Sequence, residues 1–276
     1  MNLNVWGLRE IEAFQAMMMA KDTIDIYAFT EVTDCLLSRG QTNLCYSDQA
    51  EERPQRVNAN RLITEMVADT HDVYYSHADG TRRPWTCHQH GTTFDGVAFG
   101  SLLCWSKKLT YICDGSFRVS GNSEVSPRTV QYIVFEKDGE IYLFIHFHGV
   151  WIRANTKGDT EPGGLRDQQS LMIKKNIDQI KRDHGIEKVI LGGDFNLDIN
   201  TRALRMLEEV GDTPMINHIK RRDITNTRTE LYRHYGDGSP LYADYLLTSP
   251  EVNVLAFEVM NDCLASDHAP VMAAFE

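Results

Sequence analysis

The segment 189–198 places a carboxylate and an amide where a buried strand is expected to end. The apolar residues Val189–Leu191 lead into two glycines and then into Asp194 and Asn196. Side chains alternate along a strand, so an extended chain would direct these two polar groups to one side and Phe195 into the core. A carboxylate beside an amide can orient a water molecule and donate a hydrogen bond to a phosphate oxygen. Gly, Asp and Asn also form ordinary turns, so the segment alone leaves both interpretations open.

Two further segments carry groups that could act on a phosphate or a metal ion. Asp267 and His268 stand just before an apolar run, where an imidazolium could face a developing negative charge. The strand-like run 24–29 leads to Glu31, whose carboxylate suits a hard cation such as Mg2+. Taken singly, an Asp-His dipeptide and a solvated glutamate at a strand end are both common.

The elements that must position these groups follow from the spacing of apolar residues. Strands are expected at 2–6, 24–29, 97–105, 109–113, 129–135, 141–147, 189–191, 242–247, 252–259 and 271–275, and helices near 11–18, 57–70, 165–184 and 202–210. Asp138-Gly139 predicts a hairpin turn, and 41–56 and 151–164 are expected to be loops. This order predicts an α/β fold, a four-layer α/β sandwich of two mixed β-sheets packed face to face with helices on the outer faces. No linker or repeat interrupts the chain, so residues 1–276 are expected to form one domain.

The composition limits which partners the protein can have. A formal net charge of −11 and a pI near 5.4 argue against gripping nucleic acid through bulk positive charge, although a basic rim or a metal ion could still meet phosphates locally. The six cysteines are scattered and form no CxxC pair, which favours free thiols in a reducing compartment. No apolar run reaches the length of a membrane span, and no signal peptide is evident. We therefore expect a cytoplasmic protein without stable membrane association, and no protein partner can be inferred.

Five motifs occur together in one order along the chain. They are Asn4–Leu8, the strand ending in Glu31, Gly193–Asn196, Ala243–Leu247 and Ser266–His268. With them the chain resembles the endonuclease/exonuclease/phosphatase superfamily, the deoxyribonuclease I-like group, over essentially its whole length. The resemblance implies the four-layer sandwich and a hydrolysis of phosphoesters that uses Mg2+ or Mn2+ as cofactor.

The resemblance also implies which residues surround the metal ion. Glu31 would be the main Mg2+ ligand, Asn4 would orient the scissile phosphate or the water shell of the ion, and Asp267 would hold metal-bound water. Trp6 stands where some apurinic endonucleases carry a second metal carboxylate. This departure leaves Glu31 as the one direct protein ligand that the resemblance supports, and it weakens an assignment to that subgroup.

A second set of matching residues would carry the chemistry. Asp194 would position or deprotonate the attacking water, and Asn196 would bind the phosphate. His268 would stabilise the charge of the transition state, with Asp244 fixing its ring. In-line attack on a phosphodiester needs these functions, because it requires an oriented nucleophile, charge neutralisation and a stabilised leaving oxygen.

The resemblance further implies a histidine at the end of the strand 141–147, where the sequence offers both His146 and His148. We favour His148, because Gly149 ends the strand there and leaves the ring at the sheet edge, and His146 stays the alternative. Such a pair can also bind Zn2+, but no third ligand stands nearby at a recognisable spacing. The segment Cys87–His90 is interpreted as a polar surface loop.

The core of the family would fix the reaction class, whereas surface loops would fix the substrate. A nuclease that cleaves the nucleic-acid backbone is favoured by basic residues in or beside candidate rim loops and by one basic run, namely Arg53, Arg56, Arg61, Arg82, Arg83, Arg153, Lys157 and Lys220–Arg222. A scatter of solvated charges is the alternative interpretation. The alternative function is a phosphatase or phosphodiesterase acting on a lipid or small-molecule phosphoester, such as a phosphoinositide or sphingomyelin, but no long apolar loop suits a membrane surface. The choice between DNA and RNA, the mode of cleavage, the number of metal ions and the oligomeric state stay open.

Overall fold

The computed structural model describes residues 1–19, 21–35, 45–46, 55–77, 83–86, 93–119, 128–151, 163–210, 213–233 and 241–276. Its strands are β1 (Asn2–Asn4), β2 (Ile26–Cys35), β3 (Cys45–Tyr46), β4 (Gln55–Arg56), β5 (His71–His77), β6 (Arg83–Thr86), β7 (Thr93–Ser106), β8 (Thr110–Val119), β9 (Arg128–Lys137), β10 (Glu140–His148), β11 (Lys188–Asp194), β12 (Glu209–Val210), β13 (Thr213–Pro214), β14 (Ile216–Asn217), β15 (Asp244–Thr248), β16 (Val254–Val259) and β17 (Val271–Phe275). Its α-helices are α1 (Ile11–Met18), α2 (Ala59–Val67), α3 (Leu165–His184), α4 (Arg202–Glu208) and α5 (His218–Arg221), and short 3-10 helices lie at Trp6–Leu8 and Lys21–Thr23.

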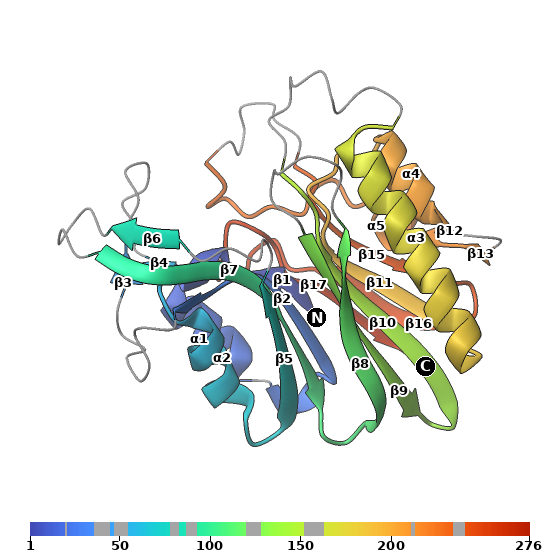
Figure 1. Ribbon diagram of the computed structural model, residues 1–276, viewed down its shortest axis with the longest axis horizontal. Coiled ribbons are helices and arrows are strands. Elements are labelled where there is room, and N and C mark those ends of the chain that lie inside the picture. The colour runs from blue at the N-terminus through green and yellow to red at the C-terminus, as the bar shows by residue number, and fades with distance from the viewer. Residues whose placement is uncertain are drawn as a thin grey trace.

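Two mixed sheets hold most of these strands (Figure 1). The first sheet has the order β16-β17-β1-β2-β7-β5, with β6 paired to β7, and the second sheet has the order β14-β15-β11-β10-β9-β8. β1 runs parallel to β2 and β10 runs parallel to β11, whereas β17, β7, β9 and β15 pair antiparallel to these strands. The first sheet thus combines strands from both ends of the sequence, and the second is built from one continuous stretch.

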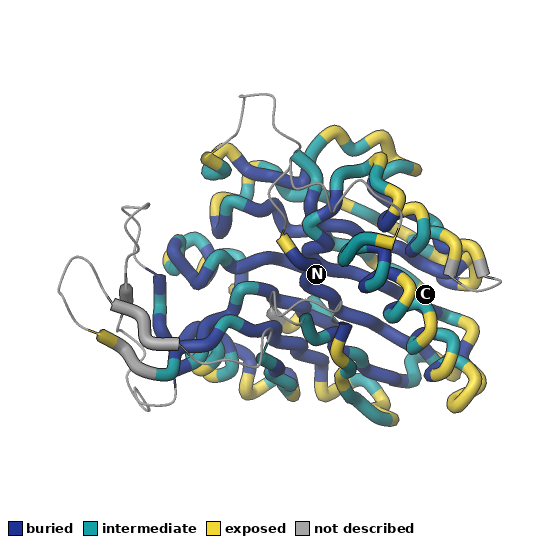
Figure 2. Tube along the Cα trace, turned by 45° about the horizontal axis from the view of Figure 1, so that its top comes forward, coloured by how far each residue is buried: buried dark blue, intermediate teal, exposed yellow. Residues whose placement is uncertain are grey.

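Three hydrophobic clusters separate four layers. Phe14 of α1 and Ile63 of α2 pack with one face of the first sheet. Ile177 of α3 packs with the outer face of the second sheet. Phe144 and Val271 belong to the cluster between the two sheets. Figure 2 shows buried segments, in dark blue, running through the centre of the molecule. The sheet order and the three clusters confirm the predicted sandwich of two sheets with outer helices.

Strand alternation decides which side chains enter the space between the sheets. In β10, Phe147 packs toward α3 whereas Phe144 packs between the sheets. His148 is four residues from Phe144 and therefore shares its inward face. The same alternation in β11 sends Leu191 to the helix side and Ile190 inward, so Asp194 also faces inward. Polar groups consequently gather between the sheets at the end where these two strands terminate.

Several predicted elements agree with the structure in detail. The helix expected at 165–184 is α3, and Asp138-Gly139 forms the predicted hairpin turn with φ values of 54° and 82°. The helix expected at 202–210 ends at Glu208, because Glu209–Val210 pairs with β13 as a short strand. Among the described residues, no helix has the length and apolar character needed to cross a membrane.

Other segments differ from expectation. β5 was not predicted, because its polar side chains at His71, Asp72, Ser76 and His77 obscure the apolar alternation of a strand. β8 continues to Val119, well past the expected strand at 109–113. Part of the expected loop 41–56 forms β3 and β4, which pair with each other. The rest of that loop, the segment Cys87–His90 and most of 151–164 lie outside the described residues. A single domain over residues 1–276 stays a prediction.

Candidate active site

Asn4 and Asp194 connect the two sheets where β1 and β11 end. The Nδ2 atom of Asn4 donates a hydrogen bond to Oδ2 of Asp194 at 2.9 Å, and both side chains are almost fully buried. The Oδ1 atom of Asn4 accepts a hydrogen bond from the backbone N–H of Trp6 at 2.9 Å. Since its oxygen is engaged by the backbone, the Asn4 amide is fixed with its donor side toward Asp194.

Glu31 reaches the same place through a bulge in β2. The pairing of β2 with β7 shifts register between Phe29 and Val32, and Glu31 has a left-handed φ of 55°. Regular alternation would send this side chain to the helix side with Phe29, and the bulge re-aims it. Burial raises the pKa of Glu31 most, and the negative charges of Asp267 and Asp194 raise it further. The carboxylate is therefore held in a place that favours a compensating positive charge.

Asn196 is fixed behind Asp194 by its own backbone. β11 ends at Asp194 and Asn196 has a left-handed φ of 51°, so the strand alternation assumed from the sequence does not reach Asn196. The Oδ1 atom of Asp194 accepts the backbone N–H of Asn196 at 2.9 Å, and Nδ2 of Asn196 donates to the carbonyl of Gly149 at 3.2 Å. A Cβ at Gly149 would lie 2.0 Å from the carbonyl oxygen of Phe195, so this contact between the strand ends requires glycine. Phe195 is buried in the core, as predicted.

His268 and Asp244 form a buried pair beside Asp194. The Nδ1 atom of His268 donates to Oδ2 of Asp244 at 2.7 Å, and Nε2 of His268 lies 3.8 Å from Oδ2 of Asp194. Burial lowers the pKa of His268, but the charges of Asp244, Asp194 and Asp267 outweigh burial and leave that pKa raised. Burial also raises the pKa of Asp244. The hydrogen bond to Asp244 fixes the orientation of the imidazole ring.

Arg228 completes this group, and the sequence did not predict it. Its backbone forms an isolated antiparallel bridge with His268, and its Nη1 atom contacts Nε2 of that ring. The same Nη1 lies 3.9 Å from Oδ2 of Asp267, and the guanidinium lies over the ring of Tyr232 at 4.5 Å. A hydrogen bond from Arg228 to Nε2 requires a ring nitrogen without a proton, so a proton at Nε2 and this contact exclude each other. Arg228 stands in an irregular segment, where no apolar period marks a position.

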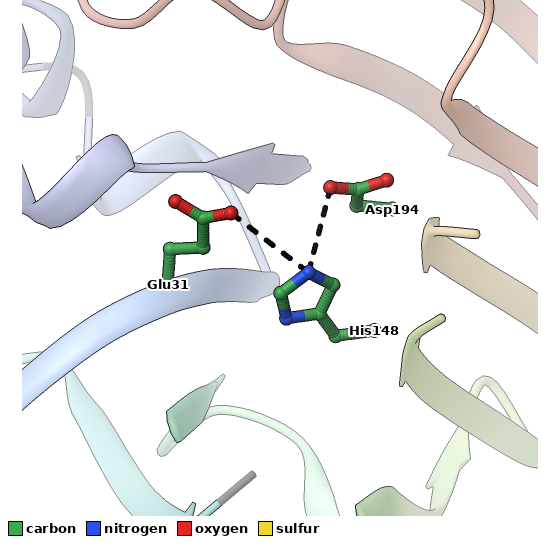
Figure 3. A group of neighbouring side chains, drawn as sticks. All are labelled: Glu31, His148 and Asp194. Atoms are coloured by element: carbon green, nitrogen blue, oxygen red, sulfur yellow. Dashed lines mark ion pairs between the residues drawn. The ribbon is translucent and has the colours of Figure 1, made fainter. Parts of the chain in front are cut away.

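His148 lies between the two carboxylates that come from opposite sheets. Its Nε2 atom is 3.7 Å from Oδ2 of Asp194 and 4.0 Å from Oε1 of Glu31, as Figure 3 shows. Its Nδ1 atom is 3.5 Å from Nη1 of Arg128. Burial, and then the charge of Arg128, lower the pKa of His148 to about 3. The ring is therefore neutral at pH 7 in this arrangement.

His146, the alternative histidine, has other partners. Its Nδ1 atom lies 3.1 Å from Oε1 of Gln131, and its buried Nε2 atom has no hydrogen-bond partner. Gln131 in turn donates to the carbonyls of Tyr74 at 2.7 Å and Ser101 at 3.2 Å, which belong to the first sheet. Burial lowers the pKa of His146 to about 3. His146 thus takes part in a hydrogen-bonded link between the sheets.

The ligand atoms of two overlapping groups converge as they would around a metal ion. Those of Glu31, His148 and Asp194 lie within 4.8 Å of one another, and so do those of Asp194, Asp244 and His268. The second group is fully buried, whereas the side chain of Glu31 is 32% exposed and opens the first group to solvent. Carboxylate oxygens suit hard divalent cations, and a cation would offset the negative charges that raise the pKa of Glu31. The first group therefore fits a divalent metal ion.

Among the basic residues considered for the rim, Arg61 and Lys220–Arg222 lie elsewhere, and several others lie outside the described chain. Arg61 is on α2 and pairs with Glu65 at 2.7 Å. Arg56 is in β4. Lys220–Arg222 spans the end of α5, whose first residue contacts Thr248 at the end of β15 remote from the active site. This basic run is therefore not part of the rim. Outside the described part of the chain lie Arg53, Arg82, Arg153, Lys157 and the side chain of Arg83.

A family model described as the endonuclease/exonuclease/phosphatase family matches residues 1–268. The chain belongs to this family. Family members are metal-dependent phosphoesterases or nucleases, so the protein is a phosphoester hydrolase that uses a divalent metal ion. None of the functionally curated proteins matches the sequence significantly.

Several solved structures with a similar fold align with almost the whole of this chain. The catalytic domain of human nocturnin with bound sulfate has a TM-score of 0.64 at 15% identity, over 98% of this chain and 87% of that one. A mannosyl-6-phosphatase of Bacteroides thetaiotaomicron has a TM-score of 0.63 at 17% identity, over 98% and 91%. Truncated TDP2 of Caenorhabditis elegans has a TM-score of 0.59 at 16% identity, over 98% and 92%. These similarities support the fold of the sandwich.

Proposed function

We propose that the protein is a Mg2+-dependent phosphodiester hydrolase that cleaves a nucleic-acid backbone by in-line attack of a water molecule. The observation that carries this proposal is the position of Asp194, which Asn4 binds at 2.9 Å and which the rings of His148 and His268 flank at 3.7 and 3.8 Å. Burial raises the pKa of Asp194, but positive groups, first among them His268, outweigh burial and hold it below its ordinary value. Asp194 is therefore an oriented carboxylate at neutral pH, able to accept a proton from water.

The groups around Asp194 would meet the charge of the substrate. The backbone N–H of Asn196 donates to Asp194, and the side-chain Nδ2 donates to the carbonyl of Gly149 at 3.2 Å. The second N–H of Nδ2 would donate to a phosphate oxygen. His268 and Arg228 would provide donors for the charge that develops on the phosphate, and Asp244 would hold the His268 ring for that task. His148 would orient the Asp194 carboxylate or the attacking water.

Of the converging group Glu31, His148 and Asp194, Glu31 would be the direct ligand of the metal ion, with Asn4 and Asp267 beside it. Oxygen donors favour Mg2+ or Mn2+. When bound, the ion would neutralise charge on the phosphate and help to orient it. The protein's own side chains would accept the proton from water and donate hydrogen bonds to the phosphate.

The choice of nucleic acid as substrate rests on two arginines at the site. Arg128 lies beside His148 and Arg228 lies beside His268, so two guanidinium groups lie at the site, where they would meet phosphates that flank the reacting one. With a formal charge of −11, the protein would make few such contacts, so binding should weaken only modestly with salt. The likeness to a mannosyl-6-phosphatase supports a sugar phosphate as the second candidate. Free thiols at Cys35, Cys104, Cys113 and Cys263 support a reducing, cytoplasmic location.

A panel of substrates with Mg2+ tests the proposal. It contains plasmid DNA, single-stranded DNA, RNA, mannose 6-phosphate, inositol phosphates, sphingomyelin and a chromogenic phosphodiester. We expect nicking of the plasmid or cleavage of RNA that is lost in Asp194→Asn and kept in Asp138→Asn, which makes the same chemical change at the other end of β10. Release of phosphate or phosphocholine, with the nucleic acids untouched, would overturn the choice of substrate. Turnover that is unchanged in Asp194→Asn would overturn the proposed site.

A further inference from the structure

A polar cavity lies where α5 meets the turn that follows β15. Its volume is about 640 Å³, and it is lined by Ile216, His218, Arg221, Arg222, Pro250 and Val252–Val254. β15 begins with Asp244 at the active site and ends with Thr248 before this turn. Four residues of extended chain, about 13 Å, therefore separate the active site from this end of the strand. Figure 1 shows β15 within the second sheet and the short helix α5 near it.

His218 lines the cavity and carries a buried nitrogen without a hydrogen-bond partner. The residue is 2% exposed, and its Nε2 atom lies 2.9 Å from Oγ1 of Thr248. Its Nδ1 atom is also buried, yet it has no hydrogen-bond partner. The ring packs against Phe257 with centroids 5.6 Å apart, which holds it in place. Buried polar atoms are normally satisfied, so an unpaired nitrogen on a residue that lines a polar cavity points to a missing ligand.

Two positive charges face the same cavity. Within the described chain, neither Arg221 nor Arg222 forms an ion pair, whereas the adjacent Lys220 pairs with Glu208 at 2.6 Å. Burial lowers the pKa of His218, and the charges of Arg221 and Arg222 lower it further, to about 4. The two guanidinium groups therefore lie close enough to act on the buried ring.

Carboxylates flank the cavity without lining it, because Glu251 lies between the lining residues Pro250 and Val252, and Asp223 follows Arg222. The Oε1 atom of Glu276 accepts a hydrogen bond from Nδ2 of Asn253 at 3.0 Å, and Glu276 is not among the lining residues. The charge that faces the interior is thus positive.

We propose that this cavity binds a phosphate-type oxyanion, as the free ion or as the end of a small phosphomonoester. Two guanidinium groups, each with a fork of N–H donors, match the oxygens of such an anion. The Nδ1–H group of His218 would donate a further hydrogen bond, with the Thr248 hydroxyl donating to Nε2. This site is separate from the active site and does not depend on the proposed function.

Histidine-selective NMR of the full-length protein tests the proposal. The ring signals of His218, assigned with His218→Phe, are followed while inorganic phosphate is added, and chloride at matched ionic strength is the reference. We expect a saturable change for phosphate and a rise in the pKa of His218 when the anion is bound. Glycerol phosphate in the same titration distinguishes a site for esterified phosphate from a site for the free ion.

Variants of α5 decide whether the arginines form the site. Arg221→Gln combined with Arg222→Gln should weaken phosphate binding at His218 by about tenfold or more, because two charge-assisted contacts are lost. Lys220→Gln, on the same helix but paired with Glu208, should leave the binding constant unchanged. An equal response to chloride would mean that an adventitious ion only is sensed. That result, or a phosphate response that survives in the double variant, would overturn the proposal.

Discussion

Replacing His148 and His146 separately by alanine should have two different effects. His148 stands between carboxylates of opposite sheets, with Nε2 at 3.7 Å from Asp194 and at 4.0 Å from Glu31. In enzymes, removal of one positioned donor from a reacting charge costs about a hundredfold to a thousandfold in turnover. We expect a loss of kcat of that size for His148→Ala, because no other neutral imidazole is placed between these two carboxylates in the described chain.

His146→Ala should instead be a stability variant. Its Nδ1 atom pairs with Oε1 of Gln131 at 3.1 Å, so the alanine would leave a buried acceptor without its partner. Such an unsatisfied group costs about 1–3 kcal/mol. We expect the free energy of unfolding to fall by this amount, and turnover of the folded enzyme to stay within about threefold, since the reacting groups lose no direct contact.

The assay pairs turnover of a chromogenic phosphodiester in Mg2+ with urea unfolding of the same preparations. Activity is measured at a temperature where circular dichroism shows both variants to be folded. If His146→Ala loses as much turnover as His148→Ala while folded, the division of roles is wrong. Retention of a tenth or more of wild-type turnover by His148→Ala would equally refute it.

Three further predictions concern the metal ion, Arg228 and pH. Glu31→Gln should raise the Mg2+ concentration for half-maximal activity by about tenfold or more, because a hard anionic ligand is lost; an unchanged Mg2+ titration would contradict this. Arg228→Lys should lower kcat by about tenfold to a hundredfold, because lysine keeps the charge without the fork of donors, whereas Arg61→Lys on α2 should not; equal rates would remove Arg228 from the site. Folding depresses the pKa of His218 from 6.5 to about 4, so the unfolded chain binds more protons between these values. The contribution of His218 to the free energy of unfolding is thus fully present above pH 6.5. It is lost as the pH drops toward 4, and the loss is at most about 3 kcal/mol. In urea unfolding, His218→Gln should lose less free energy of unfolding than the wild type over this pH range. An identical loss would exclude His218 as a source of the pH dependence.

The sequence predicts the site residues that follow a clear apolar run. Asp194 and Asn4 stand at strand ends, and strand ends were visible as the point where hydrophobic residues stop. The predicted strand end at Glu31 is wrong, because β2 continues through this residue to Cys35, although the strand that carries Glu31 was visible. The inward direction of its side chain was not visible, because the bulge after Phe29 depends on pairing with β7 far along the chain.

Features that depend on long-range contacts could not be predicted. Alternation places His146 and His148 on one face, and their different depths arise from the alignment of β10 with β11, where His148 is level with Asp194. Arg228 comes from an irregular segment that meets His268 through an isolated backbone bridge and a side-chain contact. The basic run Lys220–Arg222 was visible, but its location at the far end of β15 required the fold.

The strand order also governs how the molecule can be assembled during synthesis. The second sheet comes from residues 110–248 and can close while the last strands are still in the ribosome, but β1 keeps an open edge until β17 arrives beside it. His268 lies three residues before the start of β17 at Val271, so it reaches Asp244 at the same stage. A nascent chain therefore combines an unprotected sheet edge with an incomplete set of reacting groups. Both conditions end together when β17 pairs with β1.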